Sequence, residues 1–337
     1  MDRSEVEKYV CQTGKRLKFN QKDLDVMKKF TVIFYLVLAL STVAETLDFP
    51  ANLKRGVTRT PEGNVEVKGV WQSFNDFSVK PRQRYRITVS ARIKAGNALE
   101  NTPAMEDLLG QMVWNPGNFP WKLPVIDYEY RGSGKRLFIR YHNTKLNVFS
   151  SKFREYKFDI YTLDNADALR FFVRANDKNN VVEIGKCEIV KVDMSKEKYL
   201  NANADFSLGD YNPGGFGYAH KGVFGKDNAG WYIDLGNSWA IGDAIPVTPG
   251  DKLKISYAGE AAANRRYMKF GVTFFDNPQF DSKKGKVGAN KLPMRLTAKE
   301  KSGSMIVPVP EGAKWMRPSF SEGLMRYIKI EKVTGDK

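Results

Sequence analysis

Few residues in this chain have the types and spacing that catalysis requires. The two histidines, His142 and His220, fall in what the strand pattern assigns to separate domains, which argues against a shared triad or metal cage. The H-E-x-x-H, G-x-S-x-G and G-x-x-x-x-G-K-[ST] motifs are missing from the sequence. A glycosidase needs only two carboxylates, so a polysaccharide hydrolase with unrecognised carboxylates stays an alternative. We assign no catalytic residue and expect a protein that is not an enzyme.

Two aromatic loops are better candidates for a binding surface. Residues 113–121 read VWNPGNFPW, and residues 210–220 read DYNPGGFGYAH; their prolines, glycines and asparagines indicate loops. Sugar rings stack on aromatic faces, while their hydroxyls bind polar side chains. The predicted ligand-binding residues are Trp114, Phe119, Trp121, Tyr211, Phe216 and Tyr218. The same rings could instead pack as the core of each loop, and the sequence leaves both readings open.

The N-terminal part predicts export. Met27 and two lysines precede an uncharged apolar run from Phe30 to Ala44, which is the plan of a signal peptide and is short for a membrane span of about 20 residues. We expect residues 27–44 to be a signal peptide or signal anchor and the protein to be secreted, periplasmic or on the cell surface. Residues 1–26 are polar, and we interpret them as an extension ahead of a start at Met27 or as a cytoplasmic tail.

The charge of the chain narrows the range of partners that it can be expected to bind. The net charge is +16; residues 1–44 hold eight basic and five acidic residues, which leaves +13 beyond them. A basic exported protein is consistent with an extracellular polysaccharide or cell-envelope glycan, whereas the export signal and the lack of a nucleic-acid motif argue against nucleic acid. Contact with a membrane is expected only through an uncleaved signal anchor. Cys187 lies in an alternating strand pattern and is predicted to be a buried structural thiol.

Strand patterns dominate the rest of the sequence. From Tyr85 to Arg92, apolar residues alternate with Arg86, Thr88, Ser90 and Arg92, which gives one apolar and one polar face. Similar short strands follow, separated by Pro, Gly, Asn and Asp, and the one expected helix is 102–112. This pattern predicts an all-β protein built from antiparallel sandwiches.

Part of the sequence occurs twice. Residues 77–91 align without a gap to residues 245–259, at an offset of 168. Two further pairs follow in the same order, namely 165–173 with 312–320 and 187–192 with 328–333. We therefore predict a first β-sandwich at 45–194, a polar linker at 195–204 and a second β-sandwich at 205–337.

The second copy carries the motifs of a known family. It contains V-x-P-G-D from Val247, F-x-V-x-F-x-D from Phe270, and V-P-x-P-E-G-A-K from Val307 through Lys314. In these motifs the chain resembles the galactose-binding-like jelly roll of many carbohydrate-binding modules. The first copy departs from the pattern, because Arg82 stands where glycine is usual. The resemblance implies two tandem antiparallel jelly-roll β-sandwiches. We expect no cofactor, with one alternative: jelly-roll modules often hold a structural calcium, for which Asp205 is the candidate ligand.

These expectations combine into one functional hypothesis. We predict a secreted, non-catalytic protein that binds extracellular carbohydrate, with an anionic polysaccharide as one option. The first alternative is a structural or adhesive envelope protein whose sandwiches bind protein. The second is the hydrolase named above. Fold alone does not choose among them.

Overall fold

The computed structural model describes residues 44–96, 123–137, 146–148, 150–208, 213–216, 218–219, 222–277, 286–287, 294–297 and 302–333. Residues 44–337 form one compact unit, and both hydrophobic cores consist of residues of this unit. The expected signal segment, apart from Ala44, and the expected helix at 102–112 lie outside the described residues. Within the described part, no helix has the length and apolar character needed to span a membrane.

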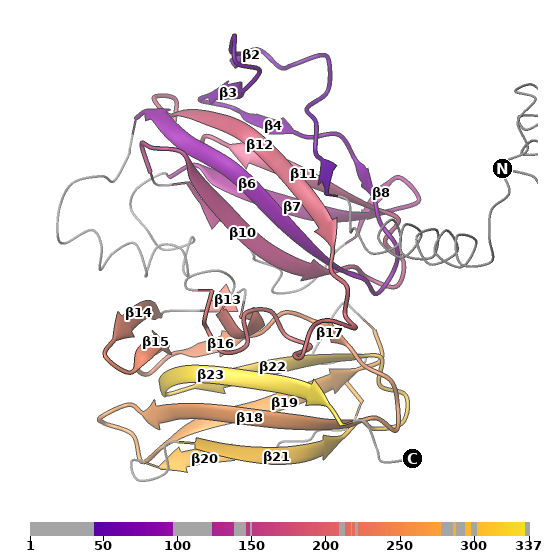
Figure 1. The fold of residues 1–337 in the computed structure, drawn as a ribbon, viewed down its shortest axis with the longest axis vertical. Coiled ribbons are helices and arrows are strands. Elements are labelled where there is room, and N and C mark those ends of the chain that lie inside the picture. Colours follow the sequence, from indigo (N-terminus) through magenta and orange to yellow (C-terminus); the bar gives the residue numbers. More distant parts are fainter. Residues whose placement is uncertain are drawn as a thin grey trace, which may run out of the picture. The chain divides into compact units, whose positions relative to one another are not determined.

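The first set of strands forms two facing antiparallel sheets (Figure 1). Sheet A runs in the order β10-β6-β12-β3-β2, with β1 also paired to β12, and sheet B runs β4-β11-β7-β8, with β5 and β9 at its sides. The strands of sheet A are β1 (Glu45–Thr46), β2 (Val57–Arg59), β3 (Val65–Lys68), β6 (Arg84–Ala95), β10 (Arg154–Tyr161) and β12 (Val181–Lys191). Those of sheet B are β4 (Trp71–Ser73), β5 (Phe77–Ser78), β7 (Val125–Gly132), β8 (Lys135–Leu137), β9 (Leu146–Asn147) and β11 (Ala168–Arg174).

The second set repeats this arrangement. Sheet C runs β13-β16-β22-β19-β20 with β17 on β22, and sheet D runs β14-β15-β23-β18-β21 (Figure 1). The strands of sheet C are β13 (Tyr218–Ala219), β16 (Trp239–Ile241), β17 (Ile245–Pro246), β19 (Tyr267–Phe275), β20 (Met294–Thr297) and β22 (Trp315–Ser321). Those of sheet D are β14 (Val223–Asp227), β15 (Gly230–Asp234), β18 (Lys252–Ala261), β21 (Ser302–Pro308) and β23 (Gly323–Lys332). The predicted class, tandem antiparallel β-sandwiches, is confirmed.

Alternating side chains build each sandwich. In β6, Ile87, Val89 and Ala91 are buried in the core between sheets A and B, while the residues between them lie on the outer face, away from that core. The second core is built in the same way around Ile255, Phe274 and Trp315. The burial of these side chains is the main source of stability, because each large apolar side chain contributes about 1.5–3 kcal/mol.

The strand registers show that the sequence repeat is a structural repeat. Ile87 lies opposite Ile189 in sheet A, and Ile255 lies opposite Ile330 in sheet D. Val65 lies opposite Ile184 just as Ile233 lies opposite Met325. The offset of 168 thus extends from β6 and β18 back to β3 and β15, and β12 matches β23 at an offset of 141.

Both copies carry a β-bulge at the same place. In β12, Cys187 lies opposite Val89 and Ile184 opposite Ala91, so two residues, Gly185 and Lys186, face the single residue between Val89 and Ala91. In β23 the bulge falls at Arg326, the residue equivalent to Gly185. A bulge bends the strand and re-aims the side chain that it carries. The two copies therefore place different residues, glycine and arginine, at one special position of the outer face.

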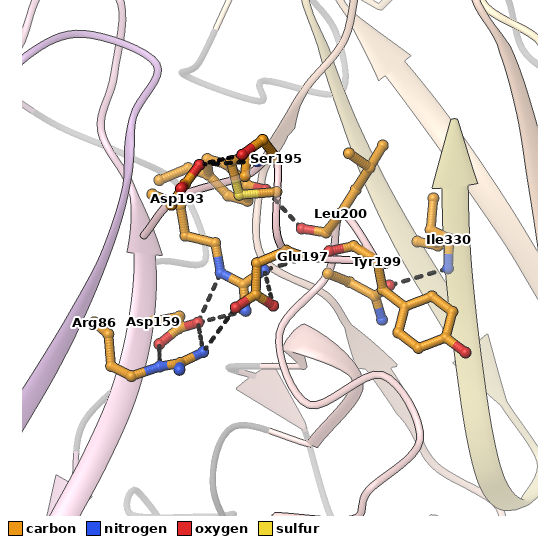
Figure 2. Close-up of polar contacts among 12 residues, drawn as sticks. Arg86, Asp159, Asp193, Ser195, Glu197, Tyr199, Leu200 and Ile330 are labelled. Carbon is orange, nitrogen blue, oxygen red and sulfur yellow. Dashed lines mark hydrogen bonds and ion pairs between the residues drawn. The ribbon is translucent and has the colours of Figure 1, made fainter. Parts of the chain in front are cut away.

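The segment after β12 that contains the expected linker at 195–204, which we call the connector, is held on both sides. Arg84 and Asp159 form a buried ion pair, with side chains 1% and 3% exposed, and Arg86 also donates to Asp159 (Figure 2). The connector contacts Arg84 at two points. The carbonyl of Tyr199 accepts a hydrogen bond from Arg84, and Glu197 Oε2 lies 3.8 Å from Arg84 Nη1. Figure 2 shows the Glu197 carboxylate beside Asp159 and Arg86, while the Tyr199 ring points away from them.

The connector then joins sheet D. The amide of Leu200 donates to the carbonyl of Ile330 at 2.8 Å, and the carbonyl of Leu200 accepts the Tyr161 hydroxyl at 2.6 Å (Figure 2). Burial raises the pKa of Tyr161 to about 12, so this hydroxyl stays a donor across the neutral range. Asn201 is buried and bonds to both Ile328 and Ile330. The expected polar linker at 195–204 is thus, in its second half, a packed segment.

Candidate functional site

In the first sandwich, three side chains converge on the bulge residue Gly185 on the outer face of sheet A, and we call this place the Gly185 cradle. A Cβ atom on Gly185 would lie 3.4 Å from Phe153 Cε1 and 3.5 Å from both Asn64 Oδ1 and Ser90 Oγ. An aromatic ring edge, an amide oxygen and a hydroxyl therefore converge on one point above a residue without a side chain. The cradle is formed by Asn64, Ser90, Arg92, Phe153, Glu183 and Gly185.

The strands fix these groups in place. Ser90 and Arg92 are successive outward residues of β6, and Glu183 precedes the bulge on β12. Asn64 immediately precedes β3, which pairs with β12. Sites built on strands keep a more precise geometry than sites on loops. Four of the six cradle residues thus belong to strands of sheet A, and the other two, Asn64 and Phe153, immediately precede β3 and β10.

A buried carboxylate orients the polar side chains. Glu183 accepts a hydrogen bond from Asn64 Nδ2 at 2.7 Å and from Arg92 Nε at 2.8 Å. Because a carboxylate only accepts, the amide nitrogen of Asn64 must face Glu183 and its oxygen must face the cradle. Burial alone would raise the pKa of Glu183, but the hydrogen bonds from Asn64 and Arg92 and the Arg92 charge lower it, so Glu183 is ionised at neutral pH.

Two of the groups retain hydrogen-bonding capacity. In the part of the chain that the structure describes, neither Asn64 Oδ1 nor Ser90 Oγ has a hydrogen-bond partner. Phe153 is 42% exposed, and the Arg92 guanidinium lies 4.6 Å from its ring centroid, which holds the ring in place. The cradle therefore offers an acceptor, a hydroxyl and an apolar ring to a ligand that has both hydroxyl groups and C–H faces.

The equivalent place in the second sandwich is filled. There Arg326 replaces Gly185, Tyr232 replaces Asn64 and Glu260 replaces Arg92. The Arg326 guanidinium donates to both oxygens of Asp227 at 3.0 and 2.9 Å and lies 3.9 Å from Glu260. Hydrogen bonds from Arg326 lower the pKa of Asp227 and keep the pair ionised. The second copy thus has an ion pair where the first has a glycine.

Two of the six residues predicted from the loops, Phe216 and Tyr218, belong to the described part of the chain. Trp114, Phe119, Trp121 and Tyr211 lie outside the described residues, so their role stays a prediction. Tyr218 belongs to β13. Phe216 is buried, 2% exposed, and its ring meets that of Phe320 edge-on at 4.9 Å. The structure therefore places Phe216 in the core of the second sandwich, where it has no exposed face to offer a ligand.

Asp205, the predicted calcium ligand, lies in a local turn, and its role as a ligand stays a prediction. Its Oδ1 accepts from the backbone amide of Ser207 at 3.2 Å and from the Ser207 hydroxyl at 2.7 Å, which makes a local turn. Burial would raise the pKa of Asp205, but these hydrogen bonds and the charge of Lys329 lower it. Within the described ranges, no three His, Cys, Asp or Glu residues come together to hold a metal ion.

The cradle was not predicted from the sequence, although part of its signal was there. The outward alternation of β6 predicted that Ser90 and Arg92 face away from the core, and the structure confirms it. Nothing in the pattern around Phe153 or Gly185 indicates that they meet. The repeat could have helped, because extending the offset of 168 beyond the aligned strands also pairs Trp71 with Trp239 and Asn64 with Tyr232.

Comparisons with known proteins add a fold similarity. No family model matches the chain, and no curated protein matches it. Among solved structures, it is similar to the tandem CBM22-1-CBM22-2 domain of Xyn10C from Paenibacillus barcinonensis, with 12% identity, a TM-score of 0.30, and 87% of this chain and 97% of that chain covered. That neighbour is a tandem of carbohydrate-binding modules, the class that the sequence motifs of this chain resemble.

Other similar structures come from a bacterial glycoside hydrolase and from a plant ectodomain. The tandem CBM51 modules of the family 98 glycoside hydrolase Sp3GH98 from Streptococcus pneumoniae SP3-BS71 share 10% identity, with a TM-score of 0.21 and coverage of 86% of this chain and 93% of that chain. The ANX1 ectodomain from Arabidopsis thaliana shares 8% identity, with a TM-score of 0.24 and coverage of 88% and 89%. Identities and TM-scores this low carry no argument about a ligand, which has to come from the residues.

Proposed function

We propose that the protein is a non-catalytic carbohydrate-binding protein and that the Gly185 cradle of the first sandwich is a sugar site. The observation that carries this proposal is the convergence of Phe153, Asn64 and Ser90 above a glycine. A sugar ring presents C–H groups to an aromatic side chain and hydroxyls to the acceptor and the hydroxyl beside it. The preformed shape lowers the entropic cost of binding.

The chemistry of the cradle supports binding rather than hydrolysis. Its carboxylate, Glu183, is buried beneath Asn64 and Arg92, and both of its oxygens accept hydrogen bonds from them. A general acid for glycoside hydrolysis needs a raised pKa, whereas the pKa of Glu183 is lowered. Glu183 is therefore a positioning residue in this proposal, and the sugar is held without being cleaved.

The finer features of the function are also proposals. An extracellular or cell-surface location rests on the apolar segment 27–44, and a glycan of the extracellular space or cell envelope follows from that location. The net charge of +13 beyond residue 44 favours a polyanionic chain over a neutral one, because it concentrates anions near the surface. The aromatic loop 113–121 is proposed as a second contact region for the same glycan.

A glycan array with residues 44–337 tests the proposal. We expect binding to at least one polysaccharide, and we expect Phe153→Ala and Gly185→Ala to reduce that binding by tenfold or more. Gly185 does not have a positive φ, and its new Cβ would make ordinary contacts of 3.4–3.5 Å, so the alanine variant should fold while it fills the cradle.

A matched control separates the cradle from general surface effects. Trp71, in β4 of sheet B, is 45% exposed, so Trp71→Ala removes a large exposed ring from the same sandwich without touching the cradle. It should leave the affinity unchanged. An array without any bound glycan would refute the function. Glycan binding that survives both cradle variants, and falls only with Trp114→Ala or Trp121→Ala, would move the site to the loop.

A further inference from the structure

The outer edge of sheet D is a seven-residue strand without charged side chains. β21 is the edge strand of this sheet, and it pairs on one side with β18 along its whole length. Its sequence, SGSMIVP, contains no charged residue, and Ile306 is 60% exposed. Long, uncharged edge strands with an exposed apolar side chain are templates for pairing with another strand.

The first sandwich shows how the same edge can be blocked. β10 is the equivalent edge strand of sheet A, and it carries Arg154, Glu155, Lys157 and Asp159. Charged side chains along an edge discourage edge-to-edge pairing. Sheet A therefore has the usual protection at this edge, and sheet D lacks it although the two strands occupy the same place in the repeat.

The backbone groups of β21 point outward at alternate residues. The amide of Val309 donates to the carbonyl of Asp251, the residue before β18. Every second residue counted back from Val309 therefore directs its backbone N–H and C=O groups toward β18. Ser302, Ser304, Ile306 and Pro308 therefore direct their backbone groups away from the sheet. Among the described residues, no backbone group pairs with this outer side of β21. The outer side has amide donors as well as carbonyl acceptors for a further strand.

We propose that β21 is a self-association surface, on which β21 of a second copy of this chain pairs antiparallel and extends sheet D across both copies. A second copy fits because an uncharged strand is matched best by another uncharged strand, so that no charge is buried. Antiparallel pairing about a twofold axis is also self-complementary, since each strand meets the same groups on its partner.

Proline selects the register of this pairing. With the twofold axis at Ser304, each Ser304 faces its counterpart and each Ile306 faces Ser302 of the partner subunit, so all of these residues exchange both hydrogen bonds. With the axis at Ile306, Ser304 would face Pro308, which lacks an amide hydrogen. The Ser304 register therefore forms more hydrogen bonds, and the small side chains of Ser302 and Ser304 leave room for Ile306.

The lysines of the adjacent strand, β18, do not oppose this contact. The lysines nearest to the edge on the adjacent strand are Lys252 and Lys254 of β18. Strands lie about 4.8 Å apart, so the β18 strands of two paired copies would be about 14 Å apart. That distance exceeds the screening length of about 8 Å at physiological salt. A single strand pair buries less than a standard interface of about 1,600 Å², so the dimer should be weak and reversible.

The test uses residues 44–337, whose two cores are complete. Sedimentation over a range of concentrations should show a monomer–dimer equilibrium, and Ile306→Lys should raise the dimer dissociation constant at least tenfold. Ile306 is exposed, so this variant should fold. Ser78→Lys adds the same charge at an exposed position of the first sandwich and should leave the dissociation constant unchanged.

Cysteine cross-linking tests the register. The Cα atoms of directly opposite, hydrogen-bonded residues lie about 5.5 Å apart, which a disulfide can span. Ser304→Cys should therefore form a disulfide-linked dimer on mild oxidation, and Ser302→Cys should form much less. The native Cys187 is buried and does not compete. A monomer at every concentration, a dimer that Ile306→Lys does not weaken, or equal cross-linking by the two cysteine variants would overturn the proposal.

Discussion

Arg82 and Gly250 occupy the same position in the two copies, and both have a left-handed backbone, with φ of 56° and 83°. Glycine adopts this conformation without steric cost, whereas arginine does not. Arg82 gains contacts in exchange, because its guanidinium donates to the carbonyl of Val247 at 2.8 Å and to Asp164 at 3.4 Å. The residue that departs from the usual pattern in the first copy is thus one that links it to the second.

Two substitutions measure the free energy cost of the left-handed backbone conformation at residue 82. Arg82→Ala and Arg82→Gly both remove the guanidinium, and they differ only in how well they tolerate the left-handed turn. We expect the glycine variant to be more stable than the alanine variant by about 1 kcal/mol in urea unfolding. Equal stability of the two variants would show that the turn relaxes when the side chain is lost.

A second contact between the copies joins Trp315 and Asp164. The indole Nε1–H of Trp315 donates to Asp164 Oδ2 at 2.8 Å, and the Trp315 ring is buried. Trp315→Phe keeps an aromatic ring but removes the donor. A double-mutant cycle with Asp164→Ala should give a coupling energy of about 1 kcal/mol, because the acceptor is charged but partly exposed. A coupling of zero would mean that the hydrogen bond does not form in solution.

The buried pair of Arg84 and Asp159 should be sensitive to the loss of one partner. Asp159→Ala leaves the Arg84 guanidinium buried without its carboxylate, and the expected loss of stability is about 3–5 kcal/mol. The double variant Arg84→Met with Asp159→Leu should recover most of that loss, since it removes the stranded charge. Urea midpoints of the single and double variants measure both effects, with Lys157→Ala, an exposed neighbour on β10, as the control.

The cradle predicts a pH dependence of stability. The pKa of Glu183 in the folded protein is lowered from its usual 4.5, so Glu183 contributes stability above about pH 4.5 that is lost as the pH falls through the lowered value. Thermal unfolding measures the stability of the wild type and of Glu183→Gln. At pH 6 the variant should be less stable by about 1–2 kcal/mol, and the difference should shrink toward pH 3. A difference that stays constant with pH would contradict the assignment.

The sequence predicted those parts of the fold that depend on local pattern. Alternation from Tyr85 to Arg92 gave β6 and its outward residues, and the repeat gave two sandwiches of the same topology. Cys187 was expected to be buried, and it is. These features follow from side-chain period and turn residues, which are visible along one stretch of chain.

The cradle and the connector could not be predicted in this way. Gly185 faces Phe153 and Asn64 only because a bulge shifts the register of β12 against β6, and pairing between strands that are distant in the sequence leaves no local pattern. Asn201 looked like part of a polar linker, yet its amide satisfies backbone groups of β23 in a buried place. A polar residue that replaces backbone partners cannot be distinguished, in one sequence, from a solvated one.

The packed connector has a consequence for handling the protein. Proteases cut where several residues of backbone are exposed and can be drawn out of the fold. The carbonyl of Tyr199, both backbone groups of Leu200 and the side chain of Asn201 are instead engaged by residues on either side. Limited digestion should therefore spare residues 199–204, and the two sandwiches should survive it as one covalent piece rather than as two fragments.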